Sequence, residues 1–218
     1  MCTAPLSRTV TLALGFDPLR YVVVISDEAG AEFDLAATRE ADAVTWLNDV
    51  LRRRALHGAD IADMPYTLAG PSDRVSSAEL QPDVTRLGLS LAAAHAALTT
   101  LIGSLPALQP GPSPVRLWPH HFDIATLVQF VAGDPASAPS IGVGYSPGDD
   151  KYAVPYLYCS PYPQPSGTAL PEPPGGWRWH TDGFVSLVLI EPSIDADVLG
   201  NAFRQAFYSA IPLVSLST

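Results

Sequence analysis

Cysteine is scarce in this sequence, since only Cys2 and Cys159 occur among its 218 residues. Two cysteines so far apart exclude the disulfide framework of small secreted proteins and the paired Cys-x-x-Cys patterns of structural zinc sites. The chain also lacks a P-loop, a dinucleotide-binding glycine motif and the His-Glu-x-x-His motif of metalloproteases. We therefore expect a protein of the reducing cytoplasm that carries none of these common enzyme signatures.

Positive charge is also scarce. There are 12 lysine and arginine residues against 22 aspartate and glutamate residues, so the formal net charge is −10. The one basic run, Arg52 to Arg54, lies where a helix is expected to end, and cations stabilise that end of a helix. A surface this acidic repels a phosphate backbone, so we expect no nucleic-acid partner. Because Lys151 is the single lysine and alanine is abundant, the composition suggests a bacterial coding sequence rich in G and C.

Charged residues of either sign make up only 16% of the chain and apolar ones 47%, a balance that excludes an intrinsically disordered protein. One stretch, Leu87 to Leu105, carries no formal charge and is long enough to span a bilayer. It contains Ser90, His95 and Thr99, however, and has no flanking aromatic anchors. We therefore predict a helix inside a folded protein and no membrane span.

Hydrophobic patterning in the first half predicts three strands followed by two helices. Apolar, β-branched runs separated by turn residues indicate strands at Val10 to Phe16, Arg20 to Ser26 and Glu32 to Leu35. Thr38 is the expected start of the first helix. A second, alanine-rich helix is predicted from about Asp83 to Leu105, and its almost uncharged surface suggests burial on more than one side.

The second half begins with five prolines between Pro106 and Pro119, which predict a rigid extended connector and a sublobe boundary near residues 106–119. Strands are expected downstream near Phe122 to Val131, Ser140 to Tyr145, Tyr156 to Ser160, Arg178 to His180 and Phe184 to Ile190. A closing helix is predicted from Asp195 to Ala210, with Pro212 ending it.

These elements predict an α+β fold, with antiparallel strands, a long buried central helix and a C-terminal helix. Strands followed by a helix occur in both halves, so an arrangement as two similar sublobes is one expected form of this fold. We expect residues 1–218 to make a single compact domain, because a chain of this length can bury a sizeable core.

Two copies of one tripeptide pattern are the best candidates for a functional site. Residues 121–123 (His-Phe-Asp) and 180–182 (His-Thr-Asp) each place an imidazole and a carboxylate on one face of a strand. An aspartate beside a histidine can orient the ring, and two such pairs suit Zn, Fe or Mn. The candidate ligands of a small molecule or divalent metal are therefore His121, Asp123, His180 and Asp182. The alternative is that each pair is a polar contact at a strand end.

Aromatic residues crowd the same part of the chain. The candidates to line a pocket there are Tyr145, Tyr156, Tyr158 and Trp179. Such side chains offer an apolar face and a polar tip, as many small-molecule sites require. Packing in the core or against the proline-rich loops would use them equally well.

Residues 144–148 (Gly-Tyr-Ser-Pro-Gly) match the nucleophile-elbow pattern of serine hydrolases. That site needs the backbone N–H after the serine to help bind the oxyanion, and Pro147 has none. We therefore reject a serine hydrolase. The segment instead predicts a turn centred on Pro147 and Gly148 and capped by Asp149 or Asp150.

The same segments carry a resemblance to a known family. They are Val115–Asp123 (VRLWPHHFD), Gly144–Asp150 (GYSPGDD), Pro155–Tyr158 (PYLY) and Trp179–Gly183 (WHTDG). In combination they resemble a bacterial family of domains of unknown function, over roughly the second half of the chain. The resemblance implies a small cytoplasmic bacterial protein in which these segments meet in space, and it implies no established activity. Relatives tend to have Glu where this chain has Val154 and Asp182, and the first change removes a carboxylate.

Two functions follow from these patterns. The leading hypothesis is a small-molecule pocket, with or without a divalent metal, in which His121 or His180 would be the general base of an enzyme. The competing hypothesis is a non-enzymatic interaction protein or homo-oligomer that uses aromatic side chains and proline-rich loops. A zinc ion shared by both histidines would require their ligating nitrogens to lie within about 4.2 Å of each other.

Overall fold

The computed structural model describes residues 10–16, 19–25, 31–34, 39–54, 56, 81–108, 110–118, 121–165 and 170–214. Cys2, Thr38 and Pro119 lie outside these residues. The chain divides into two compact units, Met1–Gly88 and Leu89–Thr218. This division falls upstream of residues 106–119, where a sublobe boundary was predicted, and the single compact domain stays a prediction.

The first unit contains a three-stranded antiparallel meander and a helix. Its strands, in sheet order, are β1 (Val10–Phe16), β2 (Leu19–Ile25) and β3 (Ala31–Asp34), followed by α1 (Glu40–Arg52). Leu47, Val50 and Leu51 form the buried side of α1, and Phe33 stacks on Trp46 with ring centroids 5.0 Å apart. The predicted meander and first helix are confirmed. The first strand has the predicted bounds, those of the other two strands differ by one residue, and the helix begins two residues after the predicted start.

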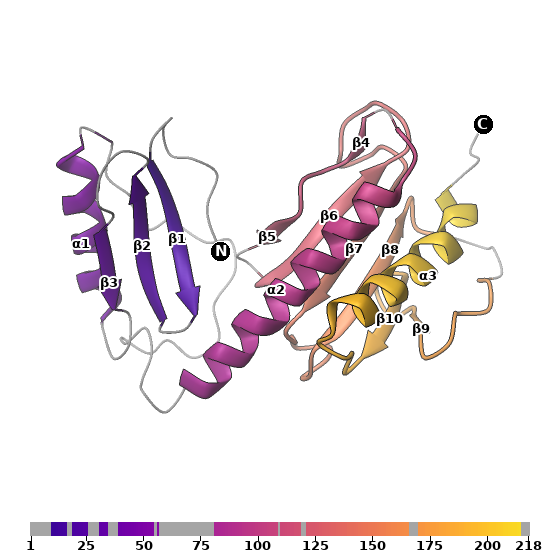
Figure 1. Cartoon of the computed structure of the whole chain (residues 1–218). Coiled ribbons are helices and arrows are strands. Elements are labelled where there is room, and N and C mark those ends of the chain that lie inside the picture. Colours follow the sequence, from indigo (N-terminus) through magenta and orange to yellow (C-terminus); the bar gives the residue numbers. More distant parts are fainter. Residues whose placement is uncertain are drawn as a thin grey trace. The chain divides into compact units, whose positions relative to one another are not determined.

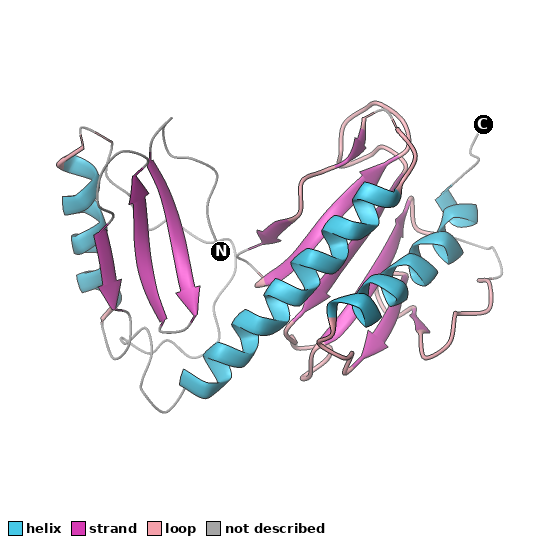
Figure 2. Ribbon diagram, in the orientation of Figure 1, coloured by secondary structure: helices cyan, strands magenta, loops and turns pink. Residues whose placement is uncertain are grey.

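The second unit is built on a seven-stranded antiparallel sheet (Figures 1 and 2). Its strands are β4 (Gly111–Pro112), β5 (Arg116–Trp118), β6 (Asp123–Gln129), β7 (Ser140–Ser146), β8 (Tyr156–Tyr162), β9 (Arg178–His180) and β10 (Ser186–Ile190). Their order is β4-β6-β7-β8-β10-β9, and β5 also pairs with β6. Its helices are α3 (Ala196–Val214) and the part of α2 (Gln81–Ser104) that follows Gly88, so the predicted α+β class, long helix and C-terminal helix are confirmed.

Proline has different effects here from those predicted. The segment 106–119 is not only a connector, because Gly111–Pro112 and Arg116–Trp118 pair with β6. Proline is compatible with such short edge strands, where its missing N–H costs little. Pro212 does not end α3, which continues to Val214. Val214 is 5% exposed, so burial of its side chain holds the last turn in place.

Alternation along the strands gives the second sheet two different faces. The helix face is the one that α2 and α3 cover (Figure 1). Its fully buried residues are Val128, Ile141, Val143, Leu157, Cys159 and Leu187, each 0% exposed. Burial raises the pKa of the Cys159 thiol, which favours an unreactive packing role. The polar face carries the alternate residues. Its glycine and polar members include Asp123, Ser140, Gly142, Gly144, Ser146, Tyr156, Tyr158, Ser160, Arg178, His180 and Ser186, and its apolar members are Ala125, Leu127, Val188 and Ile190.

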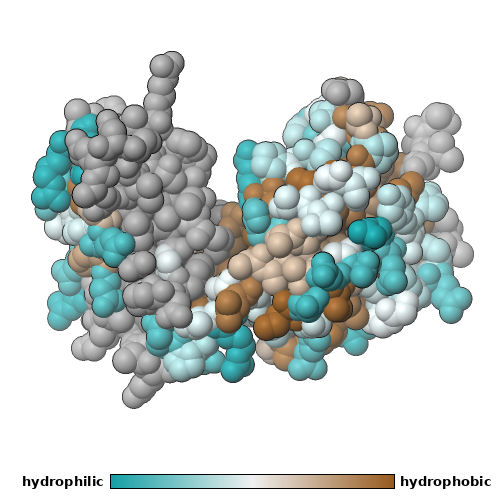
Figure 3. All heavy atoms as spheres, in the orientation of Figure 1, coloured by the Kyte–Doolittle hydropathy of each residue, from teal (hydrophilic) through white to brown (hydrophobic). Residues whose placement is uncertain are grey.

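Helix α2 is the one described helix that is long and apolar enough to cross a membrane, judged by length and composition alone. Its buried residues are Ser90, Leu91, Ala94, Ala97, Leu98 and Leu101. They form one stripe, so the predicted burial on more than one side is wrong. Leu89 is 59% exposed, and apolar surface is visible over this region of the unit (Figure 3).

Candidate functional site

A tyrosine and a carboxylate on the polar face meet across an intervening strand. Tyr158 on β8 donates a hydrogen bond to Oδ2 of Asp123 on β6, although β7 lies between the two strands. Gly144 on β7 pairs with Tyr158 and makes this crossing possible. A Cβ atom at position 144 would lie only 2.5 Å from Cζ of the Tyr158 ring. The crossing therefore depends on glycine at this position.

Burial keeps the Tyr158 hydroxyl protonated. Burial raises the pKa of Tyr158 well above 10.0, and the negative charge and hydrogen bond of Asp123 raise it further. The phenol consequently stays a hydrogen-bond donor over the whole physiological pH range. The other oxygen of Asp123, Oδ1, is fully buried and has no hydrogen-bond partner within the described part of the chain.

Asp149 organises the turn between β7 and β8. Its Oδ1 accepts hydrogen bonds from the N–H groups of Lys151 at 2.8 Å and Tyr152 at 2.9 Å. Its Oδ2 accepts one from the Tyr156 hydroxyl at 2.6 Å. Gly148 has a φ of 124°, a conformation that suits glycine. Asp149 therefore has the predicted capping role, but it acts in a loop that extends from Pro147 to Pro155, and a tight turn centred on Pro147 and Gly148 stays a prediction.

These bonds shift the ionisation of both partners. Burial raises the pKa of Asp149, but the hydrogen bonds from Tyr156, Tyr152 and Lys151 and the nearby His121 outweigh it, so the net pKa lies below 3.8. Burial also raises the pKa of Tyr156, and its hydrogen bond to Asp149 adds to the increase. Asp149 is therefore a carboxylate and Tyr156 a neutral phenol near neutral pH.

His180 is held by partners other than the carboxylate two residues away. Its Nδ1 lies 2.7 Å from the Tyr152 hydroxyl, and its Nε2 lies 2.8 Å from the backbone oxygen of Asp182. The Asp182 carboxylate forms an exposed ion pair with Lys151 at 3.2 Å. The His180 ring also packs on Phe184, with centroids 4.3 Å apart. In the neutral tautomer with its proton on Nε2, Nε2 donates a hydrogen bond to the Asp182 carbonyl and Nδ1 accepts one from the Tyr152 hydroxyl.

His121 does not share a strand face with Asp123. The strand β6 begins at Asp123, and Phe122 before it has a φ of 56°, which is the left-handed region. The i, i+2 relation of a strand therefore does not extend back to His121, which is exposed in a turn. His121 nevertheless lies near enough to Asp149 to help lower the pKa of that carboxyl.

The sheet order separates the two predicted pairs. Four strand spacings of about 4.8 Å lie between β6 and β9, so these strands are about 19 Å apart. No three His, Cys, Asp or Glu side chains among the described residues lie close enough to hold a metal ion. The arrangement therefore gives the predicted divalent-metal site no geometric support, and that site stays a prediction.

The four predicted aromatic wall residues divide between the two faces. Tyr156 and Tyr158 lie on the polar face, with the hydrogen bonds described above. Tyr145 lies on the helix face, is 2% exposed and is hydrogen-bonded to Ser90 of α2. Trp179 also belongs to the helix-face register, and its Nε1 donates to the backbone oxygen of Pro171 at 2.7 Å. Only the first two can contribute to a site on the polar face.

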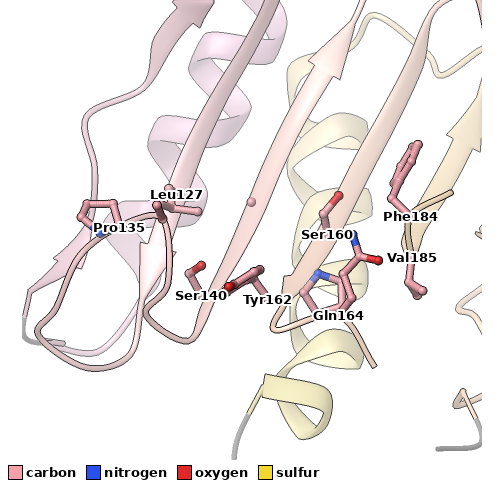
Figure 4. Close-up of a pocket in the computed structure, with 11 residues that line it drawn as sticks. Leu127, Pro135, Ser140, Ser160, Tyr162, Gln164, Phe184 and Val185 are labelled. Carbon is pink, nitrogen blue, oxygen red and sulfur yellow. The ribbon is translucent and has the colours of Figure 1, made fainter. Parts of the chain in front are cut away.

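A pocket of about 260 Å³ lies on the polar face beside this network (Figure 4). It is lined by Leu127, Pro135, Ala136, Ser140, Gly142, Ser160, Pro161, Tyr162, Gln164, Phe184 and Val185. None of the eight residues proposed from the sequence is among them. The one sequence signal for this pocket is the pair Gly142 and Gly144, because glycine at alternate positions of a strand leaves a gap on one face.

No protein-family model, curated protein or solved structure matches this chain. The resemblance to a bacterial family of domains of unknown function, the bacterial origin and the cytoplasmic location therefore stay predictions.

Proposed function

We propose that this protein binds a small, neutral, hydrogen-bonding molecule in the pocket of the polar face. The observation that carries the proposal is the composition of the pocket wall. Among the described residues that line it there is no aspartate, glutamate, lysine, arginine or histidine, although the chain carries a net charge of −10. A charged ligand would have to give up its hydration without gaining an opposite charge.

The lining residues fit such a ligand. Hydroxyl groups of Ser140, Ser160 and Tyr162 and the amide of Gln164 offer hydrogen bonds, and Leu127 and Phe184 offer apolar surface. Binding sites commonly combine a mostly apolar wall with a few polar groups. The volume lies below the range of roughly 300–1,000 Å³ typical of drug-sized ligands, which favours a smaller molecule.

One wall of the pocket is held in place by the neighbouring hydrogen-bond network. Phe184 packs on the His180 ring, and both nitrogens of that ring have partners at 2.7 and 2.8 Å. At the floor, the Ser160 hydroxyl donates to the Ser186 hydroxyl at 2.9 Å, so its lone pairs can accept from a ligand. A wall fixed before binding reduces the entropy lost when a ligand enters.

Pocket filling tests the proposal. A fragment library with matched neutral, cationic and anionic members is screened by ligand-observed NMR against the natural protein and Gly142→Val. A Cβ at position 142 would meet no atom closer than 4.0 Å, so the larger side chain fits the strand and fills the pocket floor. We expect neutral fragments to bind the natural protein and to lose binding to this variant.

The control is Gly103→Val in α2, where a Cβ would meet nothing within 4 Å and where no pocket-lining residue lies. Fragments should bind this control as they bind the natural protein. A hit set dominated by charged fragments, or one that Gly142→Val leaves unchanged, would contradict the proposal. Thermal unfolding of all three proteins checks that each is folded.

Exposed apolar side chains favour a second candidate function, the non-enzymatic interaction protein or homo-oligomer. Ile194 and Val198 near the start of α3 are each 52% exposed, and Tyr208 on the same helix is 49% exposed. Such side chains are common at the centre of protein interfaces. Light scattering over a concentration series tests this candidate by measuring the molar mass in solution. If the natural protein forms a dimer through α3, the Val198→Glu variant should have the mass of a monomer. If the natural protein is a monomer, the two proteins should have the same mass.

A further inference from the structure

One carboxylate oxygen of Asp123 has no hydrogen-bond partner among the described residues. The residue is 8% exposed at the start of β6. Its Oδ2 accepts the hydrogen bond from Tyr158, whereas its Oδ1 is buried and accepts none from any described residue. A buried carboxylate oxygen without a donor destabilises the folded state unless a ligand supplies one.

Asp149, in the turn after β7, differs from Asp123 in this respect. Its two oxygens accept three hydrogen bonds, from Tyr156 and from two backbone N–H groups. Each oxygen of Asp149 therefore has at least one donor from the protein itself, and three of its roughly four acceptor sites are used. Of these two carboxylates, Asp123 is therefore the one that has capacity left for a ligand.

Aromatic rings extend from Asp123 along this part of the polar face. The ring centroids of Tyr156 and Tyr158 are 6.2 Å apart, and those of Tyr152 and Tyr156 are 5.0 Å apart. One cation of the protein already uses this cluster, because the Arg178 guanidinium carbon lies 5.4 Å from the Tyr152 ring centroid. Tyrosine ring faces attract cations, so the surroundings of Asp123 favour a positively charged ligand.

The number of acceptor atoms that Asp123 has available determines which kind of cation can bind there. A guanidinium group binds a carboxylate best through both oxygens, and Tyr158 already occupies Oδ2 of Asp123. A divalent metal ion needs several ligands, and the described residues bring no three suitable side chains together. An ammonium group is a compact point charge that can use a single carboxylate oxygen, and the buried side chains of Ser146 and Tyr156 lie on the same end of this face as Asp123.

We propose that Asp123 Oδ1 is the acceptor of a binding site for a primary ammonium group, either inorganic ammonium or the end of an alkylamine. The site lies at the end of the polar face formed by Asp123, Ser146, Tyr156 and Tyr158. None of these four residues lines the pocket proposed for neutral ligands. The two proposals can therefore fail independently of each other.

Methylammonium chloride is the probe that tests this site. Thermal unfolding of the natural protein is followed in increasing methylammonium chloride, with sodium chloride and tetramethylammonium chloride at the same ionic strength as references. We expect a saturable rise in Tm of about 5 to 10 °C at one hundred times the Kd with methylammonium. Tetramethylammonium, which has no N–H group, should act only as sodium does. Equal responses to the three salts would overturn the proposal.

Asp123→Asn identifies the acceptor. This variant removes the uncompensated charge, so its Tm without methylammonium should equal or exceed that of the natural protein, and its response to methylammonium should disappear. Asp150→Asn is the matched control in the neighbouring turn, where the side chain is exposed, and it should respond as the natural protein does. A natural response in Asp123→Asn would overturn the proposal.

Backbone NMR of the natural protein provides a readout that does not depend on the folding of any variant. Methylammonium should shift the amide signals of Gly144 and Ser146, which flank the site on β7, more than those of Gly142 at the pocket. Shifts spread evenly over the protein would indicate a general salt effect and would contradict a site at Asp123.

Discussion

The two faces of the C-terminal sheet are made by the same strands and differ in their share of polar side chains. Residues 141, 143, 157 and 159 on the helix face are all 0% exposed and apolar. Their neighbours on the polar face are glycine, serine and tyrosine, and the hydroxyls of Tyr158 and Ser160 donate hydrogen bonds to Asp123 and Ser186. Burial of apolar area on one face stabilises the fold. The other face can therefore hold strained or unsatisfied polar groups, which is where binding sites form.

The largest expected effect is on the helix face. Phe203 on α3 is 0% exposed, so Phe203→Ala should lower the free energy of unfolding by about 3 to 5 kcal/mol. Urea denaturation measures this change. Tyr208→Ala on the same helix is the control, and because that side chain is 49% exposed, its effect should stay below about 1 kcal/mol. Equal effects at the two positions would show that α3 does not pack as described.

A smaller effect is expected where the polar face is most tightly packed. Gly144→Ala places a methyl group against the Tyr158 ring and should destabilise the protein by about 1 to 3 kcal/mol, measured by urea denaturation. Gly142→Ala, two residues away on the same face, meets only ordinary contacts at 4.0 Å and should change stability by less than about 0.5 kcal/mol. If the two variants behave alike, Tyr158 does not cross β7 at Gly144.

The smallest effect is expected in the turn that borders the polar face. Asp149→Asn keeps the shape of the side chain but weakens its hydrogen bonds, at a cost of about 1 kcal/mol near pH 7. Because the folded pKa of Asp149 lies below its ordinary value of 3.8, the ionised carboxylate stabilises the fold fully above that value. This contribution declines as the pH falls through the folded pKa.

Urea denaturation of Asp149→Asn and the natural protein at pH 7, 5 and 3 tests the sign of this effect. The difference in stability should be greatest at pH 7 and 5 and should shrink at pH 3. Asp150→Asn is the control, since its side chain is exposed. A difference for Asp149→Asn that does not change with pH would mean that the ionised carboxylate is not what stabilises the turn.

Local patterning predicts most elements of this fold. The run from Val10 to Phe16 and the strand at Arg178 to His180 have the predicted boundaries. The short edge strands at Gly111–Pro112 and Arg116–Trp118 were missed, because a proline-rich segment has no hydrophobic period and forms strands only by pairing with β6. The predicted end of α3 at Pro212 was wrong because burial of Val214 outweighs the local effect of proline.

The candidate site was predicted in part. Asp123, Tyr156, Tyr158 and His180 were named from the sequence and lie on the polar face. Their partners were not named as such, because a hydrogen bond between residues 123 and 158 or 152 and 180 depends on which strands and loops become neighbours. The prediction that His121 and Asp123 share one face of a strand is wrong for a local reason. The positive φ at Phe122 breaks the alternation of side chains before the strand begins.

The amino-acid sequence alone determined which side chains alternate along each strand, because a β-strand turns successive side chains to opposite faces. Tertiary structure decided which strands lie together, and therefore that Tyr158 reaches Asp123 across Gly144. It also decided that Oδ1 of Asp123 is buried and receives no hydrogen bond from the part of the chain that the structure describes. The physical reason is that alternation is a property of the local backbone, whereas pairing and burial depend on contacts between residues far apart in the chain.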